Sequence, residues 1–131
     1  MGVLHRGWRD NCHFLERPVP GGEFRITRDK CTGQTLAIGA ACLTVKTWRL
    51  DEASLYVTLE PCHMCAGAMV LARIDRLVFG ADDPKAGAVG SLQDLSAEPR
   101  LNHRFPVERG VLGDRCGELL RDFFRTRRMA R

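Results

Sequence analysis

The stretch that decides the fold reads Ser54-Leu55-Tyr56-Val57-Thr58-Leu59-Glu60-Pro61-Cys62-His63-Met64-Cys65-Ala66-Gly67-Ala68-Met69. Its first six residues are rich in β-branched and aromatic side chains, which predicts a strand over 54–59. Pro61 ends that strand and opens a helix, because proline is well tolerated in the first helical turn. We expect this helix to run from Cys62 to Arg73.

A second strand is expected at Arg76–Phe79, directly after this helix. Strand, helix and strand at this spacing form a right-handed βαβ unit, so the two strands should be parallel. Downstream, the Gly- and Asp-rich stretch 81–90 is expected to be a loop, and 105–108 a short strand.

Two more helices complete the prediction. A run of small apolar residues predicts a buried helix over Thr35–Lys46, with Leu36, Ala40 and Leu43 recurring at helical spacing. A terminal helix is expected over Gly113–Arg128. Its inward side chains should be Cys116, Leu119, Leu120 and Phe123. The fold class is therefore α/β, with three layers and a mixed central sheet.

The first 34 residues are atypical. Residues 17–22 read as an irregular loop and Glu23–Thr27 as one short strand, but a first core strand is hard to recognise, so we expect the N-terminal strands to be shortened or irregular. The chain offers no break in composition, so residues 1–131 are interpreted as one domain. Its regular core should span 35–131.

Composition excludes some classes of protein. No stretch approaches the length of a membrane span and no signal region opens the chain, so a soluble, cytoplasmic protein is expected. The net charge is +4, and the last eleven residues, Arg121 to Arg131, account for it with five arginines and one aspartate. A neutral body with a basic tail is consistent with a nucleic-acid partner without requiring one.

Cys62 and Cys65 differ from the four other cysteines, which are isolated in sequence. Three residues apart at a helix N-terminus, their thiols point the same way, and the helix dipole favours the thiolate form that binds Zn²⁺. Two alternatives stay open for the motif alone: a pair of half-buried core thiols, or a redox pair.

The residues around these cysteines closely resemble the zinc-binding element of bacterial tRNA-specific adenosine deaminases. The resemblance continues through Val78-Phe79-Gly80-Ala81, through Gly87-Ala88-Val89-Gly90-Ser91-Leu92, through Leu101-Asn102-His103-Arg104, and into Asp122–Arg128. It implies a cytidine-deaminase-like fold and one Zn²⁺ per chain, held in part by Cys62 and Cys65. It also implies hydrolysis of adenosine to inosine at the tRNA anticodon wobble position, and a homodimer.

The chain departs from that family where a His-x-Glu motif should supply the third zinc ligand and the proton-shuttling carboxylate. Only Gln34 lies at that point, and its amide does not titrate. His13 and Glu16, at helical i, i+3 spacing, could replace the missing pair, and His5 or Cys31 could also reach the metal in a rearranged N-terminal segment. We therefore expect impaired catalysis and doubtful zinc retention.

Residues that would contact RNA follow from the same resemblance. They are Asn102, His103, Phe124, Arg127 and Arg128, with Asp82, Asp83 and Lys85 as weaker candidates. Arginines and an aromatic ring on one helix suit phosphate contacts and base stacking, although a solvated helix with buried aromatics, Phe123 among them, would read similarly. His103 is equally consistent with a surface loop histidine, and Glu60 with a helix cap or a pocket wall. His63 is expected at the rim.

Three functions are compatible with these features. The first is an impaired tRNA adenosine deaminase, and the second is a catalytically silent RNA-binding or dimer-partner homologue. A deaminase of free nucleobases or nucleosides is the third, and the Arg-rich Phe-Phe tail argues against it.

Overall fold

The computed structural model describes residues 12–16, 23–27 and 30–129, with side chains from Gln34 onward except those of Leu36 and Arg127. A five-stranded mixed sheet forms the centre, in the order β2-β1-β3-β4-β5. Its strands are β1 (Cys12–Glu16), β2 (Glu23–Thr27), β3 (Ser54–Leu59), β4 (Arg76–Ala81) and β5 (Val107–Glu108). β3, β4 and β5 are parallel, and β1 is antiparallel to β2 and β3. The predicted α/β class and the parallel βαβ unit are confirmed.

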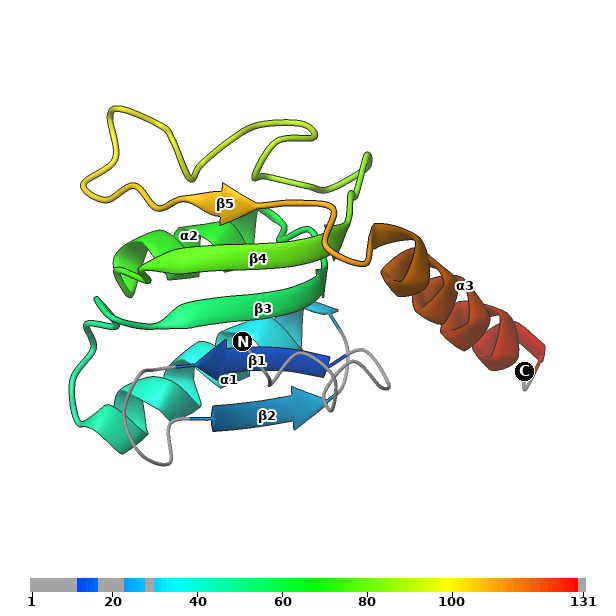
Figure 1. The fold of residues 1–131 in the computed structure, drawn as a ribbon, viewed down its shortest axis with the longest axis horizontal. Helices are drawn as coiled ribbons and strands as arrows, with labels where there is room; N and C mark the ends of the chain where they lie inside the picture. The colour runs from blue at the N-terminus through cyan, green and yellow to red at the C-terminus, as the bar shows by residue number, and fades with distance from the viewer. Residues whose placement is uncertain (1–11, 17–22, 28–29, 130–131) are drawn as a thin grey trace.

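Two helices, α1 (Lys30–Val45) and α2 (His63–Leu71), cover one face of this sheet (Figure 1). They bury an apolar core against alternate residues of the two central strands, Leu55 and Val57 of β3 and Leu77 and Phe79 of β4. Alternation puts these four side chains on one face because successive strand residues point to opposite sides. This packing fixes where α2, and with it the cysteine pair, begins.

The third helix, α3 (Gly113–Met129), begins against the other face, at the end of β4. Gly80 follows Phe79 and so faces the opposite way, where a Cβ atom on it would lie 2.2 Å from the Cys116 sulfur. Burial raises the pKa of the Cys116 thiol to about 12, so this cysteine stays protonated near neutral pH. Beyond these first turns, α3 extends away from the sheet (Figure 1).

The N-terminal segment is more regular than its sequence indicates. The predicted strand Glu23–Thr27 is β2, and it pairs along its whole length with β1, which the sequence analysis did not find. β1 lies between two partners, so hydrogen bonds from β2 and β3 stabilise a five-residue strand whose own side-chain pattern is weak. The sheet therefore does not lack its first core strand.

Two predicted burial patterns were wrong. The buried face of α1 consists of Gln34, Ala37, Ile38 and Ala41, whereas Leu43 is 82% exposed, because at 3.6 residues per turn it lies on the side of the helix opposite Gln34. Phe123, predicted as core, is 36% exposed because α3 has left the sheet by that point. Cys116 and Leu120 of α3 are buried as predicted. Of the predicted strand 105–108, only Val107–Glu108 pairs with β4.

The close approach of α3 to Gly80 gives a stability prediction. Gly80→Ala should destabilise the chain by about 1–3 kcal/mol, because the new methyl overlaps the Cys116 side chain and α3 must shift. Urea unfolding measures this directly. Gly39→Ala is the matched control, since a Cβ there meets nothing within 4 Å and should raise stability by about 0.5–1 kcal/mol. Equal effects of the two substitutions would contradict the packing described.

Candidate functional site

The cysteine pair lies where the carboxyl ends of β3 and β4 meet the start of α2. The Glu60 amide donates to the Ala81 carbonyl over 2.9 Å, which holds the two strand ends together. Cys62 is the N-cap residue of α2 and is half-buried, while Cys65, one turn later, is fully buried. The helix dipole and first-turn amides at this point favour thiolates, the form in which cysteine binds a metal.

Gln34 lies beside this strand end, inside α1. Its side chain is fully buried, and its Nε2 donates to the Leu59 carbonyl over 3.4 Å. The Gln34 Oε1 atom is also buried and makes no hydrogen bond in the part of the chain that the structure describes. An unsatisfied buried amide oxygen costs free energy, so this position is not optimised for packing alone.

The described residues supply only part of a zinc site. Cys62 and Cys65 are two suitable donors, but nowhere among the described side chains do three His, Cys, Asp or Glu residues come together to hold a metal ion. A catalytic zinc needs three protein ligands and one open position. Of the proposed substitutes, His5 lies outside the described residues, and the side chains of His13 in β1 and Cys31 in α1 are not described. The donor set that the structure describes therefore does not fit a catalytic zinc ion.

Glu60 is the buried acid of this region. Its Oε1 accepts hydrogen bonds from the Asp83 amide at 3.2 Å and from the Ser91 hydroxyl. Its Oε2 accepts from the Val89 amide at 3.2 Å and the Ser91 amide at 3.1 Å. Glu60 thus binds the loop after β4, and α2 has no side-chain cap. Of the two roles left open for Glu60, a helix cap and a pocket wall, the described residues do not show the cap.

His63 and His103 occupy different ends of the sheet. His63 is exposed at the start of α2, as expected for a rim residue, with its Nε2 2.7 Å from Gln93 Oε1. His103 Nε2 lies 2.7 Å from the carbonyl of Ile74, just before β4 begins, and the Asn102 carbonyl accepts from Arg73 over 2.7 Å. The structure therefore places Asn102 and His103 at the opposite end of β4 from the cysteines, where both support the chain turn.

The basic helix α3 starts at the same end as the cysteines. Phe124 is half exposed and packs edge-on against Phe123, with ring centroids 5.4 Å apart, while Arg128 is exposed. Arg127 belongs to α3, but its side chain lies outside the described ones. The structure thus leaves Phe124 and Arg128 available to a partner.

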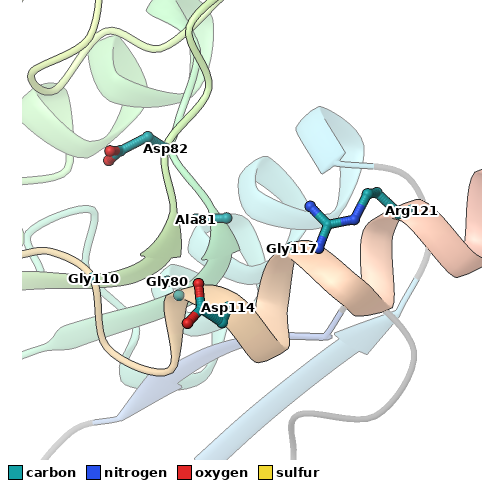
Figure 2. Close-up of a pocket in the computed structure, with 8 residues that line it drawn as sticks. Gly80, Ala81, Asp82, Gly110, Asp114, Gly117 and Arg121 are labelled. Carbon is teal, nitrogen blue, oxygen red and sulfur yellow. The ribbon is translucent and has the colours of Figure 1, made fainter.

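A hollow of about 410 Å³ separates the end of β4 from α3. Figure 2 shows the Arg121 guanidinium directed over Gly117, with the Asp114 carboxylate near Gly80. The lining residues are Gly80, Ala81, Asp82, Gly110, Gly113, Asp114, Gly117 and Arg121. The loop after β4 and the first half of α3 therefore share one surface.

The sequence analysis missed the importance of Ser91 and Gly87. A Cβ on Gly87 would lie 2.1 Å from Glu60 Oε2, so only glycine fits against the carboxylate. A local signal was present, since a charged residue directly after a buried strand needs nearby hydrogen-bond donors. The donors to Glu60 lie 23 to 31 residues further along the chain, and no local sequence pattern identifies them.

The architecture is that of the zinc deaminases, which carry a Pro-Cys-x-x-Cys helix at this point of the sheet. A family model described as MafB19-like deaminase matches residues 26–128. A solved structure from a study of A-to-I editing by tRNA:A34 deaminases at the wobble position aligns with a TM-score of 0.70 and 35% identity, over 82% of this chain and 83% of that one. A guanine deaminase from Nitrosomonas europaea shares the fold, with a TM-score of 0.65 and 22% identity, over 86% of this chain and 71% of that one.

Curated relatives agree with these matches. The chain is 54% identical over 92 residues to the tRNA-specific adenosine deaminase of Bacillus subtilis (strain 168), covering 70% of this chain and 57% of the relative. It is 44% identical over 95 residues to that of Haemophilus influenzae (strain ATCC 51907 / DSM 11121 / KW20 / Rd), covering 72% and 55%. The chain belongs to the MafB19-like deaminase family and is similar to tRNA-specific adenosine deaminases. It spans just over half the length of these curated relatives.

The unsatisfied oxygen of Gln34 can be tested by substitution. Gln34→Met keeps the shape and removes the orphan oxygen, so stability should be unchanged or rise by up to about 1 kcal/mol. The midpoint of urea unfolding measures the change. A loss of more than about 2 kcal/mol would mean that the amide is needed for folding, through its bond to the Leu59 carbonyl or through a partner of Oε1.

Proposed function

We propose that this chain binds single-stranded RNA of the tRNA anticodon-loop type and deaminates adenosine in it slowly or not at all. The observation that carries this proposal is Gln34, a buried amide at the strand end beside the cysteine helix. Hydrolytic deamination needs a group there that carries protons from water to the ring nitrogen and the leaving amine. An amide has no titrating proton and cannot serve.

RNA binding is supported by the surface around α3. Phe124 offers an exposed ring for stacking on an unpaired base, and Arg128 and Arg121 offer charges for phosphates on the same helix. The helix that carries these groups begins at the end of the sheet that holds Cys62. A relative whose name gives tRNA as its substrate, 54% identical to this chain, supports the same class of ligand.

Zinc enters the proposal through Cys62 and Cys65. When bound in this fold, zinc supplies an activated water for attack on the base. The two thiolates would hold it together with a third ligand, for which His5, His13 and Cys31 are the candidates. With only two ligands we expect weak retention, far below one zinc per chain.

A second copy of the chain is the proposed partner. The outer faces of α1 and α2 expose Leu43 at 82%, Leu71 at 74% and Met64 at 59%. The two helices contact each other, and the segment after α1 joins the end of α2 where the Leu50 amide donates to the Ala72 carbonyl over 2.8 Å. Exposed apolar side chains gathered on adjacent helices are typical of interfaces between protein chains.

No helix of the described residues is long and apolar enough to span a bilayer.

The proposed activity separates binding from turnover. An anticodon stem-loop RNA should bind in a salt-sensitive way, while inosine should form at least about 10²-fold more slowly than with the Bacillus subtilis relative assayed alongside. Filter binding and inosine quantification on the same RNA measure the two quantities. Inosine formation near the relative's rate would refute the proposal. A site that binds free guanine or cytosine, and from which the stem-loop RNA does not displace them, would favour a nucleobase deaminase instead.

The proposed dimer can be tested with one charge. Leu43→Glu should shift the chain from dimer to monomer in sedimentation velocity, because a carboxylate would be buried in an apolar interface. Leu112→Glu is the control, as Leu112 is 51% exposed but lies outside α1 and α2. A wild-type chain that is monomeric at micromolar concentration would contradict the proposed homodimer.

A further inference from the structure

The Glu60 carboxylate is fully buried, and it accepts four hydrogen bonds from one segment, the 82–91 loop. Three of the four donors are backbone amides and the fourth is the Ser91 hydroxyl. Burying an anion is costly unless donors replace its water, and bonds to a charged acceptor are about twice as strong as neutral ones. The charge of Glu60 and the closed form of this loop therefore depend on each other.

The loop also lies against the start of the cysteine helix. The Ala88 amide donates to the Pro61 carbonyl over 2.9 Å, directly before Cys62. At its other end, Asp82 pairs with Arg109 at 3.0 Å and lines the hollow beside α3. The 82–91 loop therefore connects the cysteine helix with the surface that carries the exposed arginines.

Two consecutive hydrogen bonds connect Glu60 with the backbone of Lys85 through Asp83. Glu60 holds the Asp83 amide, and Asp83 Oδ1 accepts from the amides of Lys85 at 3.1 Å and Ala86 at 3.2 Å. This turn leaves Lys85, the single cationic residue of the loop, exposed. The backbone of Lys85, from which its ammonium group extends, is thus linked to a buried carboxylate two hydrogen-bond steps away.

We propose that Glu60 is a positioning residue for RNA binding, which holds the 82–91 loop so that Lys85 meets a phosphate of the bound strand. This inference rests on the proposed RNA binding and adds a residue to it that touches no RNA itself. The phosphate class follows from the exposed cationic side chain of Lys85, in a loop whose Asp82 lines the same hollow as Arg121.

A purely structural role for Glu60 would lower stability and leave the ionic part of RNA binding unchanged. The positioning role predicts a different readout, the dependence of affinity on salt. Each phosphate contact with single-stranded nucleic acid contributes about 0.7 to the slope of log K against log salt. Loss of Lys85 from its place should therefore reduce this slope by about 0.7.

The experiment compares Glu60→Gln, Lys85→Ala and the double variant on an anticodon stem-loop RNA across a salt series. In Glu60→Gln, an NH₂ group replaces an oxygen that accepts backbone amides, so the loop should open. Each single variant should bind about 10-fold more weakly, with the slope lowered by about 0.7, and the double variant should be no worse than either. Ser91→Ala, which loses one bond to Glu60 and keeps the charge, should give a smaller loss in the same direction.

Glu98→Gln is the matched control. It makes the same change in net charge outside the 82–91 loop, at a carboxylate that pairs with Arg100 at 2.6 Å. The slope of log K against log salt should therefore stay unchanged. Hydrogen exchange of the Val89 and Ser91 amides reports loop opening without RNA, and should accelerate in Glu60→Gln alone.

Several results would overturn the inference. Affinity and slope that survive Glu60→Gln while the wild type binds RNA would overturn the positioning role alone. Additive losses in the double variant would do the same, because they would mean that Lys85 keeps its place without Glu60. No RNA binding by the wild type would overturn the proposed function as well.

Discussion

The hydrogen bonds of the Glu60 carboxylate organise the functional end of this molecule. Glu60 lies between the end of β3 and the cysteine helix, and its partners lie in the 82–91 loop. Gly87 must approach the carboxylate so closely that no side chain fits, and the loop then returns to the Pro61 carbonyl. A strand end, a helix start and a loop are thus fixed by one buried charge, as expected where a desolvated anion has to be satisfied completely.

The cysteine pair occupies the site that this arrangement creates, but the groups around it differ from those that deamination needs. Two thiols at a helix N-terminus can begin a zinc site, and a buried amide faces the neighbouring strand end. An amide can orient a polar group, yet it cannot exchange a proton. The exposed groups on which the proposed RNA binding rests are present, while a group that could serve proton transfer beside the cysteines is not found among the described side chains.

The βαβ unit around the cysteines was predictable because its signals are local. Residues 54–59 have strand-forming side chains, Pro61 marks the helix start, and Gly80 lies where β4 reaches α3. β1 was not predictable because Cys12–Glu16 becomes a strand only through partners on both sides. The start of α1 was missed because Gly33 precedes the apolar run, although packing of Gln34 and Ala37 extends the helix backwards. The partners of Glu60 depend on contacts across the fold, which single-sequence patterns do not contain.

The most direct test of the account is the zinc content per chain of the purified protein, determined by elemental analysis beside a Cys62→Ser/Cys65→Ser control. The ligand set of the described side chains, which is incomplete, predicts far less than one zinc per chain in the wild type and a similar value in the control. Near-stoichiometric zinc that disappears in the control would contradict the account, because a third ligand would then have to complete the site.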